Sequence, residues 1–165
     1  MTFIAANLGA KNKENIKKIM LYGLIWGAIF CAFDALIVLV FHNQLLGLFV
    51  ENPESLQAGY TRLSIIGYLY FIDFTMLFTA SVLRGLKRST YPMITTLLCC
   101  SVLRIVLLLT VFKLDYFHTV FWLYALVPLT WVLATICNGL ALLYVIPKQF
   151  RAIDKELESE VIREI

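Results

Sequence analysis

The sequence predicts an all-α integral membrane protein with four transmembrane helices and both ends in the cytoplasm. The composition is 61% hydrophobic and 15% charged, with a mean hydropathy of +0.82, whereas soluble domains carry roughly half apolar and about a quarter charged residues. A soluble domain of this length still exposes roughly 30% of its unfolded-chain surface. The apolar excess must therefore face lipid. Four long apolar stretches, and basic segments that alternate with them, support the same fold class.

The predicted crossings follow from length and hydropathy. About 20 helical residues cross a hydrocarbon core about 30 Å thick, and four segments meet this requirement: 19–41, 60–83, 91–112 and 119–146. Helices are expected because every backbone N–H and C=O in lipid needs an internal partner. The second segment contains Asp73, but its apolar residues contribute about −0.3 to −0.6 kcal/mol each against roughly +3 for the aspartate. Insertion of this segment is therefore favoured.

Local patterns refine two of these helices. The run Asn52-Pro53-Glu54 is typical of a helix start, with an N-cap, a proline at the first helical position and an acid in the first turn. In the first crossing, small residues recur at intervals of four: Gly23, Gly27, Cys31 and Ala35. Such a ridge allows another helix to approach closely.

The loop charges predict the orientation. Basic residues gather in three segments: Lys11, Lys13, Lys17 and Lys18 before the first crossing, Arg84, Lys87 and Arg88 after the second, and Lys148, Arg151 and Lys155 after the fourth. The intervening loops are acidic or balanced. Because loops rich in Lys and Arg stay in the cytoplasm, residues 1–18, 84–90 and 147–165 are expected on the cytoplasmic side. The membrane is expected to be the plasma (inner) membrane. The Glu-rich end of the last segment is expected to be a solvated tail.

Signatures of soluble catalysis are missing from the sequence. It contains no G-x-G-x-x-G, P-loop, H-E-x-x-H or G-x-S-x-G motif. The two histidines, His42 and His118, fall in outer loops apart from any cysteine or carboxylate cluster. The four cysteines lie inside apolar stretches without a pairing pattern. We expect no enzyme activity, metal, resident cofactor or nucleic-acid partner.

Three ionisable residues fall inside the predicted crossings: Asp34, Asp73 and Arg104. Intramembrane charges are costly and mark functional hypotheses. At a rise of ~1.5 Å per residue, Asp34 lies about 6 Å outward of the midplane, Arg104 about 4 Å outward and Asp73 about 2 Å inward.

Two pairings of these charges are open. If Arg104 pairs with Asp34, then Asp73 is a lone acid near the bilayer centre, where low dielectric favours its protonated form. Asp73 could then exchange a proton for Na⁺ or an organic cation, as a coupling residue. If Arg104 instead pairs with Asp73, the pair is a structural contact and Asp34 is the odd acid. Spacing alone weighs the two evenly.

Aromatic residues flank Asp73 on both sides in the sequence. Tyr68, Tyr70 and Phe74 are candidate contacts for a lipophilic cation, because aromatic faces attract cations. Aromatic residues in membrane helices mostly pack or face lipid, so packing is the competing interpretation.

Three motifs resemble the MATE (multidrug and toxic compound extrusion) transporter family. They are Phe3-Ile-Ala-Ala-Asn7-Leu-Gly9-Ala10-Lys11-Asn12; Asp73-Phe74 followed by Leu83-Arg84-Gly85-x-Lys87 and Pro92; and Arg104 with Val111-Phe112, His118 and Pro128-Leu-Thr-Trp131. The resemblance places the chain from the end of helix eight through helix twelve, as part of a six-helix lobe. Ala5-Ala6 departs from the family's usual Gly-Gln at this turn.

The resemblance implies a segment of a multidrug efflux antiporter that exchanges H⁺ or Na⁺ for organic cations in the lipid bilayer. Asp73 falls on a position where some bacterial members use an acid for coupling, and Asp34 matches no such position. Residues 1–165 would then be a C-terminal fragment, with Met1 an internal methionine. Because alternating access needs two lobes, transport would require the missing N-terminal lobe.

Two other functions compete with this one. A non-transporting membrane scaffold or assembly subunit would use the three charged residues only to hold helices together. A small four-helix drug antiporter acting as a dimer ranks last, because such proteins have shorter loops and no reason to carry these motifs.

Overall fold

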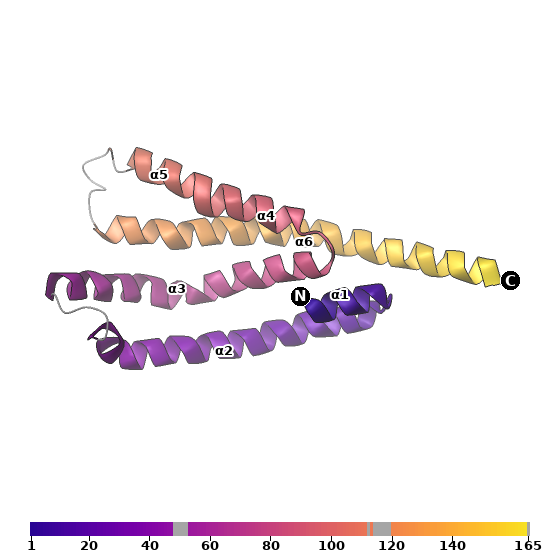
Figure 1. The fold of residues 1–165 in the computed structure, drawn as a ribbon, viewed down its shortest axis with the longest axis horizontal. Helices are drawn as coiled ribbons and strands as arrows, with labels where there is room; N and C mark the ends of the chain where they lie inside the picture. The colour runs from indigo at the N-terminus through magenta and orange to yellow at the C-terminus, as the bar shows by residue number, and fades with distance from the viewer. Residues whose placement is uncertain (48–52, 112, 114–119, 165) are drawn as a thin grey trace.

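The fold is a bundle of helices, seen in a computed structural model that describes residues 1–47, 53–111, 113 and 120–164. All regular elements in these ranges are helical (Figure 1). They are α1 (Thr2–Gly9), α2 (Lys13–Gly47), α3 (Pro53–Gly85), α4 (Thr90–Thr95), the π-helix η1 (Thr96–Val102), α5 (Leu103–Val111) and α6 (Val120–Glu164).

The predicted crossings fall within this helical framework. In the described part of the chain, three stretches are long and apolar enough to cross a membrane: Lys13–His42, Thr90–Thr110 and Tyr124–Arg163. The all-helical membrane fold is therefore confirmed. Helix α3 has 33 residues and includes Asp73, and the fourth crossing there stays a prediction.

Two helix ends bear on the sequence analysis. Pro53 is the first residue of α3, at the helix start that the Asn-Pro-Glu run predicts. The last helix extends beyond its predicted end at residue 146, because α6 continues through Pro147 to Glu164. The segment expected as a solvated tail is thus a helical extension of the last crossing.

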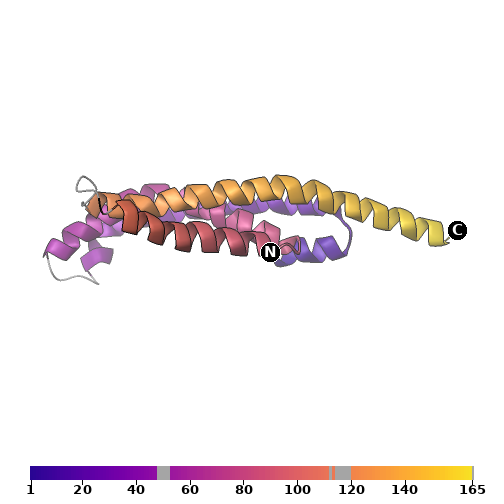
Figure 2. The same ribbon diagram turned by 90° about the horizontal axis from the view of Figure 1, so that it is seen from above.

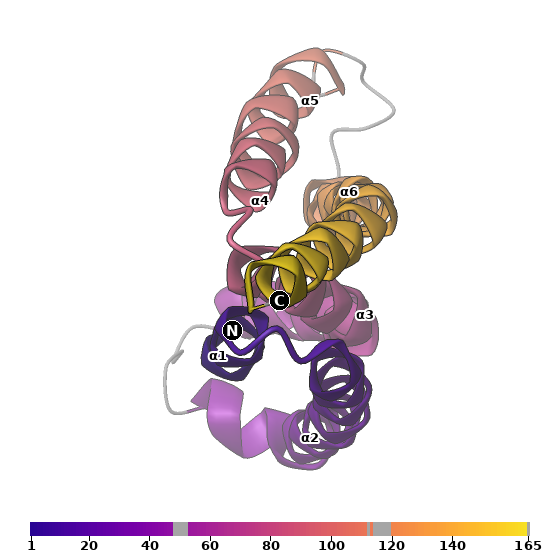
Figure 3. The ribbon, with the colours of Figure 1, turned by 90° about the vertical axis from the view of Figure 1, so that its right-hand side faces the viewer.

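The helices are arranged side by side. α3 packs between α2 and α6, and the run from α4 through α5 packs along the other side of α6 (Figure 1). Viewed end-on, α1 lies beside α2 and α3 (Figure 3). From above the bundle is thin and elongated, with the end of α6 projecting beyond the other helices (Figure 2).

The tightest packing lies near the end of the bundle that holds both termini. One buried apolar cluster joins α1, α2, the end of α3, the turn after it and α6: Ile4, Ile16, Val82, Leu83, Leu86, Leu142 and Val145. The amide Nε2 of Gln149 on α6 donates to the carbonyl oxygen of Leu86 at 3.1 Å. Most of the buried apolar residues therefore gather at this end.

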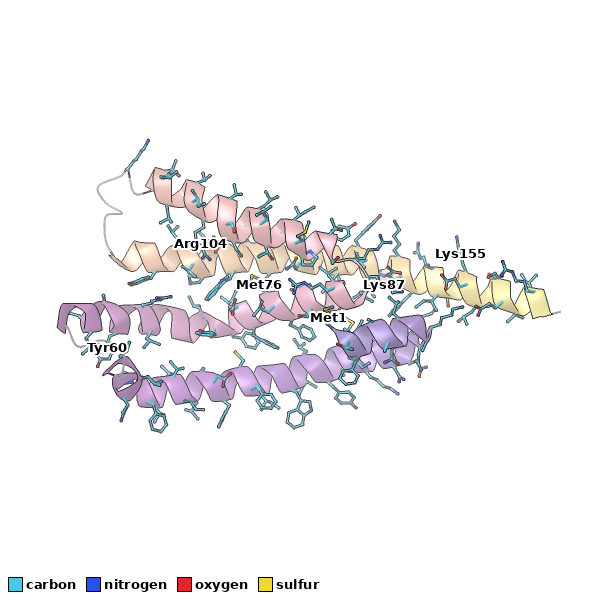
Figure 4. All side chains as sticks on the ribbon, viewed as in Figure 1. Met1, Tyr60, Met76, Lys87, Arg104 and Lys155 are labelled. Atoms are coloured by element: carbon cyan, nitrogen blue, oxygen red, sulfur yellow. The ribbon has the colours of Figure 1, made fainter. Side chains whose placement is uncertain are left out.

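The same end gathers the three basic segments predicted to be cytoplasmic. Lys87 and Lys155 lie toward the end where α1 sits, and Tyr60 lies at the opposite end (Figure 4). Lys11 pairs with Glu156 (3.8 Å) and Glu160, and Lys13 pairs with Asp154. These ion pairs join the α1–α2 turn to the extension of α6.

Candidate functional site

A groove between α2 and α3 brings two of the predicted intramembrane acids together. It has a volume of about 300 Å³, at the lower end of the range typical of small-molecule sites. Its lining comprises Gly27, Phe30, Cys31 and Asp34 from α2 and Tyr70, Asp73, Phe74 and Leu77 from α3. We call this the α2–α3 groove.

The small-residue ridge explains why the two helices meet here. A methyl group at Gly27 would lie 2.3 Å from Cε2 of Phe74, and one at Gly23 would lie 3.2 Å from Cε2 of Phe78. The absence of side chains at these positions leaves room for the rings of α3. Close approach of another helix to this ridge is thus confirmed, and the helix is α3.

The acids differ in exposure and lack a cationic neighbour in the lining. Asp73 is half-buried and Asp34 is exposed. None of the described residues that line the groove is Lys, Arg or His. Among the ion pairs of the described residues, none involves Asp34 or Asp73. Two carboxylates therefore share one groove without a protein counter-ion in it.

Aromatic side chains form much of the remaining surface. Tyr70 and Phe74, both singled out from the sequence, line the groove. The ring of Tyr70 lies 6.4 Å from that of Trp131 on α6, and the Phe74 ring lies 5.9 Å from that of Phe78. Tyr68 belongs to α3, but its side chain lies outside the described part of the structure.

Arg104 lies at a different contact. Its Nη2 donates to Oγ1 of the fully buried Thr130 at 2.9 Å. This hydrogen bond joins α5 to α6 (Figure 4). The Nε of Arg104 is buried without a hydrogen-bond partner. Neither of the two pairings considered from the sequence, with Asp34 or with Asp73, is formed in this structure.

Four lining residues were not anticipated from the sequence: Gly27 in this role, Phe30, Cys31 and Leu77. The periodicity contains the signal. Residues 27, 30, 31 and 34 share one face of α2, and residues 70, 73, 74 and 77 share one face of α3, both with the i, i+3, i+4, i+7 spacing of a helix. If this spacing is applied from Asp34 and from Asp73, it predicts most of the residues that line the groove.

A comparison with protein families decides the identity of this fold. The MatE family model matches residues 1–110, which is two thirds of the 165 residues and includes every residue of the groove. The chain belongs to the MatE family. The resemblance drawn from the sequence motifs is confirmed, and the chain is a membrane protein of a transporter family rather than of an enzyme family. Neither a curated protein nor a solved structure shows a significant match to the chain.

Proposed function

We propose that the α2–α3 groove is the ion-coupling site of a multidrug efflux antiporter, with Asp73 as the coupling acid and Asp34 as a second carboxylate. The observation that carries this proposal is the presence of both acids in one aromatic-lined groove that lacks a basic residue. Membership of a transporter family supports the same function.

The charges of the groove suggest how exchange would work. A half-buried carboxylate in an apolar setting is costly as a bare anion, so Asp73 would favour binding a proton or another cation. H⁺, Na⁺ and an organic cation would therefore compete for the same oxygens. Binding of one cation releases another, which is the elementary step of antiport.

The aromatic rings extend this chemistry to lipophilic cations. Tyr70 and Phe74 lie beside Asp73 in the lining, and each ring face attracts a cation placed within about 6 Å of its centre. A flat or bulky organic cation would contact the rings while a carboxylate neutralises its charge. Tyr68 is proposed as a further contact on the same helix.

The coupling role predicts the effect of neutralising each acid. Asp73→Asn should weaken binding of ethidium to the purified protein by roughly tenfold or more, because hydrogen bonds to charged groups contribute about 1.5–3 kcal/mol. Asp34→Asn should have a smaller effect, because Asp34 is exposed. Fluorescence titration at several pH values measures both.

The matched control is Glu158→Gln, which removes one acid from the exposed surface of α6. It should leave ethidium affinity and its pH dependence unchanged. Equal affinities for the parent protein and Asp73→Asn across the pH series would remove Asp73 from the coupling role.

A scaffold function remains the alternative, and one contact favours it. The hydrogen bond from Arg104 to Thr130 joins two helices without contributing to the α2–α3 groove. If the polar residues only hold helices together, Asp73→Asn should change thermal stability and leave cation binding unaltered. The titration above therefore separates the two functions.

Transport itself is proposed to require a second lobe. The chain is proposed to lie in the plasma membrane with both termini in the cytoplasm. Alternating access arises from rocking between two repeats around a shared site. Purified residues 1–165 in liposomes should therefore fail to move a fluorescent cation against a proton or Na⁺ gradient.

A further inference from the structure

The exposed surface of α6 changes character abruptly along its length. Up to residue 144 it is apolar, and the exposed side chains include Ile136, Leu140, Leu143 and Tyr144. Directly afterwards come Lys148, Arg151 and Lys155, which are all exposed. In a membrane protein, such a boundary marks the passage from hydrocarbon to headgroups, where tyrosine is enriched.

A hollow lies across this boundary. It has a volume of about 520 Å³, and its lining is Leu143, Tyr144, Pro147, Lys148, Arg151, Ala152 and Lys155. Lys148, Arg151 and Lys155 follow the i, i+3, i+7 spacing that places side chains on one helix face. The Nζ of Lys148 lies 5.5 Å from the centre of the Tyr144 ring. The hollow is thus apolar at one end and basic at the other.

Three acids of the same helix engage other partners. Asp154, Glu156 and Glu160 pair with Lys11 and Lys13 of the α1–α2 turn. Among the ion pairs of the described residues, none involves the three basic residues of the hollow. Their positive charge is therefore available to a ligand.

We propose that this hollow binds the headgroup of an anionic membrane phospholipid. The phosphate would lie among Lys148, Arg151 and Lys155, with the planar guanidinium of Arg151 able to donate two parallel hydrogen bonds to it. The acyl chains would follow Leu140 and Leu143, which are 62% and 74% exposed. A free phosphate would use only the basic half, whereas a phospholipid matches both ends. This proposal rests on the membrane location alone and is independent of the α2–α3 groove.

Native mass spectrometry of the purified chain tests the proposal. The protein is released from detergent after titration with phosphatidylglycerol or with phosphatidylcholine, and bound lipids are counted. Phosphatidylglycerol should bind preferentially. The triple variant Lys148→Gln, Arg151→Gln and Lys155→Gln should weaken its binding by roughly 100-fold, since each basic residue near an anionic surface contributes about fivefold. Binding of phosphatidylcholine should not change.

Two further variants keep the test decisive. Lys18→Gln, Arg84→Gln and Arg163→Gln together remove the same charge from exposed positions outside the hollow, and should reduce binding by less than threefold. Arg151→Lys keeps the charge but loses the planar donor pair, so a loss of a few-fold is expected even if the triple variant folds poorly. Equal losses in the two triple variants would overturn the site, as would displacement of phosphatidylglycerol by millimolar inorganic phosphate.

Discussion

Lys11 and Lys87 hold the backbone in the left-handed region, with φ of 55° and 58°. Each follows a helix and forms the same pair of reverse hydrogen bonds. Arg88 N–H donates to the carbonyl of Leu83 at 3.0 Å and Lys87 N–H to that of Arg84 at 3.1 Å, and the α1–α2 turn repeats the pattern. This is a Schellman motif, which satisfies helix-end carbonyls and usually places glycine at the left-handed position.

The conformation at Lys87 predicts an unusual order of substitutions. Lys87→Gly should leave stability unchanged or raise it by up to about 1 kcal/mol, because glycine has no Cβ to strain in this region. Lys87→Val should lower it by about 1–2 kcal/mol, because a β-branched side chain is strained there more than lysine is. Thermal unfolding in detergent measures both.

Arg84 provides the control, because it lies within α3 just before the turn. There glycine should destabilise at least as much as valine, in line with helix propensities. The same order of stabilities at both positions would contradict the left-handed turn.

Individual residues also show how far the sequence reaches. Asp34 and Asp73 stand out because charges are rare in apolar stretches. Their shared groove could not be predicted, because a small-residue ridge predicts a close helix contact but does not identify the partner helix. Gly85, two residues before Lys87, is the natural sequence candidate for the left-handed residue, yet it lies within α3. The requirement for glycine there comes from packing, which local sequence patterns do not reveal.

At the scale of elements, short contacts fix which helices pair. α1 docks on the end of α3 through Gly85, where an added methyl group would lie 2.8 Å from Cβ of Ile4 and 3.0 Å from the carbonyl oxygen of Met1. The continuous run from α4 through α5 contains the π-helix η1, and short π-helical segments often occur at functional sites. Hydropathy predicts the length of this run, but it does not predict the π-helical i→i+5 hydrogen bonding within it.

Docking of α1 predicts a specific response to Gly85→Ala. The added methyl group must displace the Ile4 side chain and the carbonyl oxygen of Met1, so stability should fall by about 1–3 kcal/mol, as for other overpacked sites. Relative to the parent protein, amide hydrogen exchange in Gly85→Ala should become faster in α1 and change less in α2.

Gly139→Ala on α6 is the matched control, because an added methyl group there meets no atom within 4 Å. It should preserve or slightly increase stability. A Gly85→Ala protein with unchanged exchange in α1 would show that α1 does not depend on this contact.

At the scale of the whole molecule, charge organises one end of the bundle. The sequence predicted that three basic segments share a side of the membrane, and the structure gathers them at one end (Figure 1). It could not predict that the acids of the last segment would pair with Lys11 and Lys13, because those partners lie more than 140 residues away in the chain. The Glu, Lys and Arg residues of this segment do favour a helix.

The ion pairs at this end predict how the helical extension responds to proteolysis. Lys11→Gln with Lys13→Gln should speed cleavage after the glutamates of α6 by about 2–10-fold, because exposed ion pairs contribute about 0.2–1 kcal/mol each. The difference should shrink in 1 M salt, where exposed charges are screened. Timed digestion with a glutamate-specific protease measures the rate.

Lys18→Gln with Arg84→Gln removes the same charge from residues that form none of the ion pairs given above. Its digestion rate should match that of the parent protein. Similar acceleration in both double variants would assign the effect to net charge.

Pro147 lies within α6, where it lacks the N–H that would bond to the carbonyl of Leu143. Bending is therefore easier at this turn than in an uninterrupted stretch of helix. Glu160 lies thirteen residues further on, about 20 Å along the axis, so a 10° swing about the proline would carry it sideways by about 3 Å. That distance is enough to separate an ion pair whose limit is about 4 Å. The ion pairs of Lys11 and Lys13 consequently favour one angle between the end of α6 and the rest of the bundle.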